Sequence, residues 1–234
     1  MKKNPQKNID LKQLLNEFKA NENKENVLGM ARFGINPNGT FGIPIPWLRK
    51  KAKEIGKNHS LAIELWDTGY HEPRILASMI AEPEKVTEDM MEKWVLDFDS
   101  WDVCDQVCMN LFDKTNLATK KAIDWAQREE EFVKRAGFAL MASLAFHSKT
   151  FDNSTFESFL PYIINALDDN RNFVKKAVNW ALRQIGKRNK SLNTIAIETA
   201  EFILNNKNSK SAQWIANDAL KELKNEKTIS RLKY

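Results

Sequence analysis

The chain has 234 residues, of which 42% are hydrophobic, and this is enough apolar material for one sizeable core or an extended repeat structure. Its formal net charge of +5 is compatible with a phosphate-bearing partner but does not establish one. No apolar run approaches the ~20 residues that a membrane-spanning helix needs, and the N-terminus lacks the apolar stretch of a secretory signal, so we expect neither a membrane protein nor a secreted precursor.

The N-terminal segment 1–26 is predicted to form an amphipathic helix. Its apolar positions follow helical spacing: Ile9, Leu11, Leu14, Leu15 and Phe18. Whether this helix packs against the rest of the chain or closes over a bound partner is left open. A loop is predicted at 34–46, because four of the eight glycines and three of the seven prolines fall between Gly29 and Pro46.

Residues 46–223 are predicted to form stacked helix pairs, each helix about 10 to 17 residues long. Apolar residues recur at helical spacing, as in Leu61, Leu65 and Trp66, and no alternating strand pattern stands out. The joints between helices are short and polar: Gly56–Asn58, Gly69–Pro73, Ser148–Thr150 and Asp168–Asn170. Residues 225–234 are predicted to form a tail, either a short terminal helix or a frayed end.

A weak internal repeat indicates the architecture. The segment Phe132–Ala136 (FVKRA) recurs 41 residues later as Phe173–Ala177 (FVKKA). A two-helix unit of this length is typical of HEAT-type solenoids. We therefore predict an all-α fold, a HEAT-like α–α superhelix forming a single domain over 1–234, with a concave basic face.

The seven tryptophans are predicted to serve different purposes. Four follow apolar periodicity and are assigned to the core: Trp66, Trp94, Trp125 and Trp214. Trp47, after Pro46, is assigned to packing at the start of a helix. The two cysteines, Cys104 and Cys108, lie four residues apart, and the three histidines show no ligand spacing. We expect reduced core thiols, a cytoplasmic location, no metal and no cofactor.

Trp180 stands in a basic stripe on the helix that begins near Arg171. That stripe consists of Lys176, Trp180, Arg183 and Lys187. The apolar face of the same helix runs through Val174, Ala177, Val178, Ala181 and Ile185. Trp180 is either a surface residue covered by lysine and arginine stems or an aromatic group in a phosphate-binding groove, and spacing alone favours neither.

Trp101 opens a second unusual segment. Ser100 is suited to cap a helix, and Asp102 falls in its first turn, where the helix dipole favours a carboxylate. Asp105 has no such explanation, although it shares the face of Trp101. Asp105 is either a carboxylate paired with an arginine from a neighbouring repeat or a functional group.

Arg135 is the natural partner for that carboxylate. Its helix, predicted from Phe132 to Phe146, is apolar nearly all round, so the guanidinium must pair with a carboxylate or point into a cleft at a phosphate. A structural salt bridge between repeats and a phosphate contact are both left open.

Three motifs together carry a resemblance. Trp101–Asp105, Phe132–Ala136 and Phe173–Arg183 resemble the bacterial and archaeal alkylpurine DNA glycosylases built from HEAT-like repeats, and the resemblance spans about Leu28 to Leu223. It implies a monofunctional hydrolase of base excision repair that releases cationic N3- and N7-alkylpurines from double-stranded DNA. In that family the lesion stays stacked instead of being flipped out.

The same resemblance implies roles for individual residues. Trp101 and Trp180 would pack against the deoxyribose of the lesion. Asp105 would stabilise the oxocarbenium-like sugar and position water, and Arg135 would hold a phosphate. Neighbouring cations would contact the DNA backbone: Lys134, Lys176, Arg183 and Lys187. A monomer would suffice to bind the duplex.

One departure from the family pattern concerns its N-terminal tyrosine, which precedes a Gly-Ile element. Here Phe41–Pro44 provides that element, the region before it contains Met30–Ile35, and the first tyrosine of the chain is Tyr70. This difference keeps a DNA-structure binder without catalysis as an alternative. A third alternative is a protein-interaction scaffold, the commonest use of HEAT-type solenoids.

Overall fold

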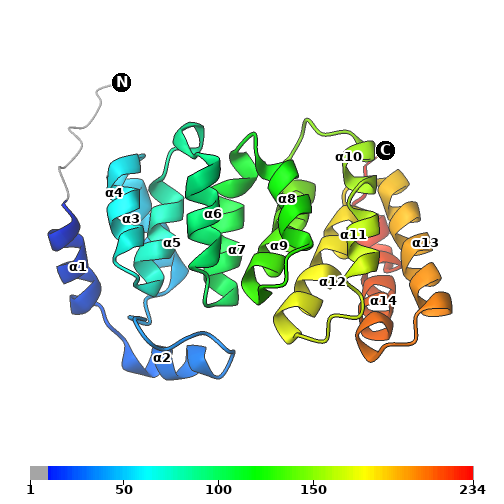
Figure 1. Ribbon diagram of the computed structural model, residues 1–234, viewed down its shortest axis with the longest axis horizontal. Helices are drawn as coiled ribbons and strands as arrows, with labels where there is room; N and C mark the ends of the chain where they lie inside the picture. Colours follow the sequence, from blue (N-terminus) through cyan, green and yellow to red (C-terminus); the bar gives the residue numbers. More distant parts are fainter. Residues whose placement is uncertain (1–9, 234) are drawn as a thin grey trace. The chain divides into compact units, whose positions relative to one another are not determined.

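The computed structural model describes residues 10–233, which fold into helices joined by short connections (Figure 1). Within those residues the only β-type pairing is an isolated bridge between Asn189 and Lys233, so the predicted all-α fold class is confirmed. Contacts divide the chain into two compact units, the first ending at Thr115 and the second beginning at Asn116. How the units combine into one domain, and whether a concave face results, stay predictions.

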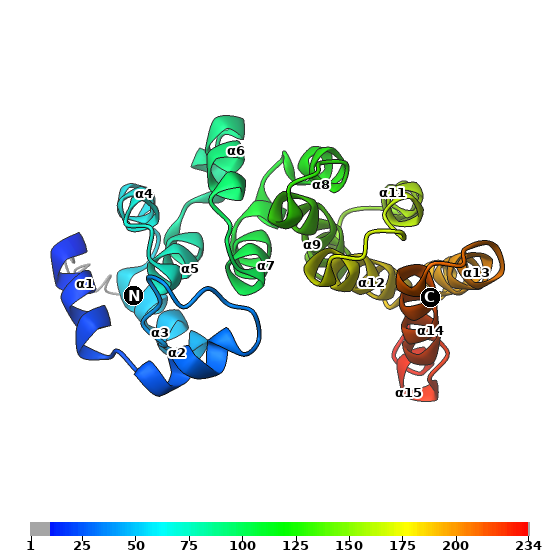
Figure 2. The same cartoon turned by 60° about the horizontal axis from the view of Figure 1, so that its bottom comes forward.

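The first unit is built in two layers. It contains α1 (Leu11–Ala20), α2 (Lys24–Ala31), α3 (Ile45–Ile55), α4 (His59–Asp67), α5 (His71–Ile80), the 3₁₀ turn η1 (Pro83–Lys85), α6 (Glu88–Leu96), α7 (Trp101–Asn110) and the 3₁₀ turn η2 (Phe112–Lys114). Helix α5 packs between α3 and α7, while α4 covers α5 from the other layer (Figure 2). Helix α6 joins α4 in that layer, because the indoles of Trp66 and Trp94 stack 3.9 Å apart at 2°.

The N-terminal segment forms two helices instead of the single one predicted. Asp10 caps α1 by accepting a hydrogen bond from the Gln13 amide at 2.7 Å, and Leu14 and Phe18 are fully buried. Residues 1–9, including Ile9, lie outside the described part of the chain. The chain between α2 and α3 is the predicted loop, and Gly42 within it has a φ of 75°. A β-carbon there would lie 2.2 Å from the carbonyl oxygen of Asn23, so only glycine fits.

The joint predicted at Gly69–Pro73 is shorter than expected. Helix α5 already begins at His71, so His71, Glu72 and Pro73 form its first turn, and all three are buried. A proline is compatible with the first turn of a helix, because the amide that it lacks has no intrahelical partner there. The proline therefore misplaced the predicted boundary, and two titratable residues assigned to a polar joint belong to the interior.

The second unit repeats the two-layer arrangement. It contains α8 (Ala118–Ala126), α9 (Glu131–His147), α10 (Asn153–Glu157), α11 (Leu160–Asn165), α12 (Asn172–Gly186), α13 (Lys190–Asn206), α14 (Lys210–Leu223) and α15 (Glu226–Ile229). Helices α9, α12 and α14 pack side by side, and α8, α11 and α13 cover them (Figure 2). The predicted tail therefore contains one short helix, α15.

The two copies of the internal repeat start the neighbouring helices α9 and α12. The rings of Phe132 and Phe173, the first residues of the two copies, stack with centroids 5.6 Å apart. Helix α9 also approaches α8 closely, since a β-carbon on Gly137 would lie 2.3 Å from the Ala126 amide nitrogen. The weak sequence repeat thus marks a structural repeat.

Three of the four tryptophans assigned to the core are buried there, namely Trp66, Trp94 and Trp125. The assignment of Trp214 is wrong, because 39% of this residue is exposed. It lies at the edge of the buried face of α14, and the ammonium of Lys175 stands 5.1 Å from its ring centroid, an arrangement that favours a partly exposed indole. Trp47 packs against Phe18 at 5.4 Å, as predicted for a residue at the start of a helix.

Candidate functional site

Trp101 and Asp105 occupy one face of α7. Residues on the adjoining side of the helix, which faces the core, are fully buried: Val103, Cys104, Val107 and Cys108. Trp101 and Asp105, one helical turn apart, are both only half-buried. Their shared face therefore combines an aromatic ring with a carboxylate at the border between core and solvent.

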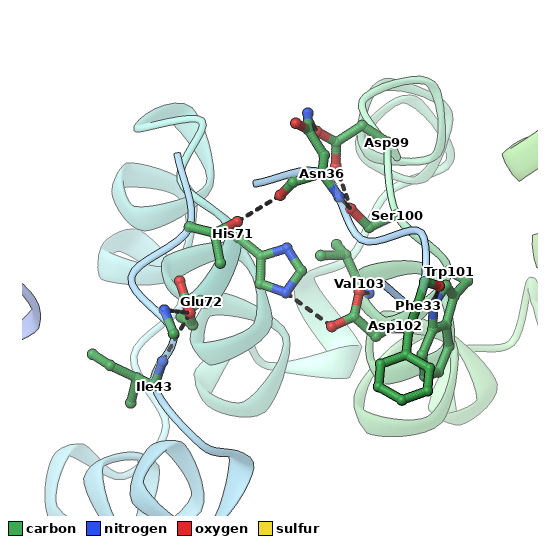
Figure 3. A network of polar contacts seen from close by, with 12 residues as sticks. Phe33, Asn36, Ile43, His71, Glu72, Asp99, Ser100, Trp101, Asp102 and Val103 are labelled. Atoms are coloured by element: carbon green, nitrogen blue, oxygen red, sulfur yellow. Dashed lines mark hydrogen bonds and ion pairs between the residues drawn. The ribbon is translucent and has the colours of Figure 1, made fainter. Parts of the chain in front are cut away.

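The indole of Trp101 is held by the loop before α3. Its Nε1 donates a hydrogen bond to the carbonyl oxygen of Phe33 at 3.1 Å. Next to it, the Asn36 amide donates to the hydroxyl of Ser100 at 3.3 Å, and the Asn36 side chain donates to Asp99 at 2.7 Å (Figure 3). Ser100 occupies the predicted N-cap position, but its hydroxyl bonds to this loop and makes no cap hydrogen bond.

Asp102 has a second role beyond its favourable position in the first turn of α7. Its Oδ2 accepts a hydrogen bond from Nε2 of His71 at 2.9 Å, and His71 is only 5% exposed (Figure 3). Burial opposes protonation of the ring, but the hydrogen bond and negative charge of Asp102 outweigh it, and the pKa of His71 is raised above its usual value. This pair fastens the start of α7 to the start of α5.

Glu72, in the first turn of α5, holds the Gly-Ile element (Phe41–Pro44) in place. This carboxylate is 1% exposed and accepts three backbone hydrogen bonds, from Phe41 at 2.8 Å, from Gly42 at 2.6 Å and from Ile43 at 3.0 Å. A buried carboxylate is tolerated when backbone donors surround it in this way. The loop that carries Phe33 is therefore fixed at both ends, to α5 and to α7.

In the second unit, Arg135 lies in the interior of the repeat. It is 5% exposed, and its Nη1 donates to the carbonyl oxygen of Phe173 at 2.6 Å, across the contact between α9 and α12. The Nζ atom of the neighbouring Lys134 lies 3.6 Å from a carboxylate oxygen of Asp169 and 3.9 Å from one of Glu129. Both cations therefore contact acceptors within their own unit.

The basic stripe of α12 meets carboxylates of α14. Glu222 accepts from Arg183 and from Lys187, each at 2.7 Å. Burial alone would raise the pKa of Glu222, but these two cations lower it below its usual value. Trp180 is half-buried on the same stripe, and Lys176 is exposed. The positive charge of the stripe is thus partly neutralised by the protein itself.

The predicted site residues fall in different units: Trp101 and Asp105 in the first, Arg135 and Trp180 in the second. Their convergence on one site stays a prediction. Sequence reasoning missed His71 and Glu72, and the only available signal was a cluster of titratable residues next to Pro73.

The described residues also bear on two other kinds of site, a metal centre and a membrane-spanning helix. Among residues 10–233, no group of three or more histidine, cysteine, aspartate or glutamate side chains is arranged to hold a metal ion. No helix in the same part of the chain is long and apolar enough to cross a membrane. Cys104 and Cys108 are buried thiols that are not joined in a disulfide, and burial raises the pKa of Cys108.

The stacked helix pairs place the chain in the class of HEAT-like helical repeat proteins. A solved structure shares this fold with a TM-score of 0.80 and 22% identity, over 96% of this chain and 97% of that one. That structure represents "a new family of proteins related to the HEAT-like repeat DNA glycosylases with affinity for branched DNA structures".

A model of the DNA alkylation repair enzyme family matches residues 14–223, and the chain belongs to that family. The resemblance drawn from the motifs is thereby confirmed at the level of the family. In sequence the chain is 24% identical to the uncharacterized protein Lin0241 of Listeria innocua over 199 residues, which cover 83% of this chain and 87% of that protein. The uncharacterized protein Lmo0209 of Listeria monocytogenes is 22% identical with the same coverage.

Proposed function

We propose that this protein binds alkylated duplex DNA and hydrolyses the N-glycosidic bond of cationic N3- and N7-alkylpurines, without flipping the base. The observation that carries this proposal is the pairing of Trp101 with Asp105 on one half-buried face of α7. Such a face offers an aromatic surface to a sugar and a carboxylate to the positive charge that develops on it.

The chemistry requires little else from the protein. Alkylation at N3 or N7 makes the purine a cationic leaving group, so the base needs no strong general acid. The carboxylate of Asp105 would stabilise the oxocarbenium-like sugar and orient the attacking water. Trp101 and Trp180 would enclose the deoxyribose, and Arg135 would supply positive charge to a backbone phosphate. No lysine nucleophile is needed, and we expect no strand cleavage by the protein.

The backbone of the duplex would be contacted by the cations of the second unit: Lys134, Lys176, Arg183 and Lys187. Of these, Lys176 is exposed and available, whereas the others would exchange a carboxylate partner for phosphate. Such an exchange preserves ion pairing and releases counterions from the DNA, so binding should weaken as salt rises.

Release of 7-methylguanine from methylated duplex DNA tests the proposal. We compare wild type with Asp105→Asn and with Asp124→Asn, a control in which an exposed carboxylate of α8 is changed in the same way. We expect Asp105→Asn to bind DNA but to release base about 10²–10³-fold more slowly, the loss typical of a catalytic electrostatic group. Wild type that binds DNA yet releases no base would reject the hydrolase.

A second candidate is binding of branched DNA without hydrolysis. It is favoured by the absence of a tyrosine before the Gly42–Ile43 element and by the basic stripe that contains Arg183 and Lys187. The relative of known structure is described as having affinity for branched DNA. A four-way junction and a linear duplex of equal length separate the candidates: a strong preference for the junction, with no base release from either substrate, favours the second.

A further inference from the structure

Exposed apolar side chains gather beside Trp101. Leu28 at the middle of α2 is 66% exposed, and Phe33 just after α2 is 73% exposed. Together with Trp101, Ile43 and Pro44 they line a pocket of about 580 Å³ that lies entirely within the first unit. Large apolar side chains exposed next to one another on a folded surface are typical of a binding site.

This pocket is held in shape before anything binds. The carbonyl of Phe33 receives the indole N–H of Trp101, and Asn36 is tied to Ser100 and Asp99. Figure 3 shows the rings of Phe33 and Trp101 extending to the same side, away from the His71–Asp102 pair. A preorganised aromatic pair loses little conformational entropy on binding, so its contact area is converted efficiently into affinity.

We propose that Phe33 is a DNA-contacting residue, and that its ring and Trp101 together receive the sugar and base of one nucleotide. This inference rests on the proposed function, because it extends the surface assigned to Trp101. The pocket has a volume within the range of about 300–1,000 Å³ typical of ligand sites. Arg32 on its wall offers a cation to the phosphate of the nucleotide, and Glu25 is the one carboxylate among the lining residues.

The contact needs a ring face and no hydroxyl. Stacking on phenylalanine, tyrosine or tryptophan serves any base, since every base has a π face. With Phe33, this chain would therefore have an aromatic contact to DNA although no tyrosine precedes its Gly42–Ile43 element.

Substitution of Phe33 removes its ring and leaves the contacts of its backbone unchanged. The hydrogen bond to Trp101 uses the backbone carbonyl of Phe33, so Phe33→Ala leaves that bond in place. We compare wild type with Phe33→Ala, with Phe33→Tyr and with Phe146→Ala, a control that removes a ring of similar exposure near the end of α9. The probe is a duplex carrying one 3-deaza-3-methyladenine, an uncharged analogue of an alkylated purine that keeps its base and is not hydrolysed, and binding is followed by fluorescence anisotropy over a series of salt concentrations.

We expect Phe33→Ala to weaken binding by at least about fivefold, while Phe33→Tyr and Phe146→Ala bind as wild type does. The salt dependence should not change, because stacking releases no counterions. Wild-type affinity in Phe33→Ala overturns this inference and leaves the proposed function standing. A wild-type protein that binds no DNA at all rejects both.

Two further outcomes would also overturn the inference. A loss of affinity accompanied by a shallower salt dependence would mean that a phosphate contact was lost instead of stacking. Unchanged DNA binding together with a loss of self-association in light scattering would assign the exposed rings to contact with a second copy of the chain.

Discussion

Replacing Glu72 by glutamine should destabilise the first unit far more than its conservative chemistry suggests. The carboxylate accepts three backbone hydrogen bonds: Gly42 and Ile43 donate to Oε1, and Phe41 donates to Oε2. In Glu72→Gln the remaining oxygen can keep the Gly42 and Ile43 amides. The new NH₂ group then faces the Phe41 amide, and this buried donor loses its acceptor.

The size of the effect follows from these contacts. A buried donor without an acceptor costs about 1–3 kcal/mol, and the two retained bonds lose the contribution of a full negative charge, on the order of 1 kcal/mol. We therefore expect the free energy of unfolding to fall by about 2–4 kcal/mol, a large fraction of the roughly 5–15 kcal/mol that stabilises a typical domain.

Urea unfolding followed by circular dichroism measures this difference. Glu64→Gln is the matched control, because Glu64 is an exposed residue of α4, and surface substitutions of this kind change stability by about 0.5 kcal/mol or less. Hydrogen exchange should locate the loss, with the amides of Phe41 and Gly42 exchanging faster than in wild type. Equal stabilities for Glu72→Gln and Glu64→Gln would refute the argument that this carboxylate holds the loop.

Three other substitutions test separate parts of the structure. Because the pKa of His71 is raised in the folded state, this residue should contribute stability that is complete below its unfolded pKa of about 6.5 and is lost as pH rises through the folded value. Asp102→Asn should flatten this pH dependence of the free energy of unfolding, measured in urea titrations. Parallel pH profiles for the variant and wild type would contradict this expectation. Glu222→Gln should leave Arg183 available to a phosphate, which should raise DNA affinity and steepen the slope of log affinity against log salt concentration by up to about 1. Unchanged binding would show that the stripe does not contact DNA. Gly137→Ala should lower the free energy of unfolding by about 1–3 kcal/mol, because the new β-carbon crowds α8, and this cost outweighs the higher helix propensity of alanine. A more stable variant would disprove the close approach of α9 to α8.

Helical periodicity predicted the fold because the core depends on it directly. The five apolar positions assigned to α12 from Val174 to Ile185 are all fully buried. The repeat of Phe132 at Phe173 marked helices that do pack together, since a solenoid buries each pair against the next. Such patterns lie within a single helix or recur at a fixed period, so they can be read without knowing any long-range contact.

The polar contacts of the first unit could not be read in this way. Glu72 meets Phe41, Gly42 and Ile43 about thirty residues before it in the chain, and His71 meets Asp102 thirty-one residues after it. Nothing in the local pattern distinguishes a carboxylate that accepts three buried amides from one exposed in a polar joint. Pro73 also marks turns and first helical turns equally well, so the boundary of α5 was misplaced.

The basic stripe of α12 illustrates the same limit for charge. Spacing placed Arg183 and Lys187 together on one face, and this is confirmed because both donate to the same carboxylate. The acceptor, Glu222, lies on α14, thirty-nine residues beyond Arg183 and outside any pattern that α12 carries. Under the proposed function, a phosphate approaching this face would meet the charges of both helices, so the affinity for DNA would depend on how readily Glu222 releases its two cations. The geometry of α12 would then set where a phosphate binds, and the carboxylates of α14 would set how tightly.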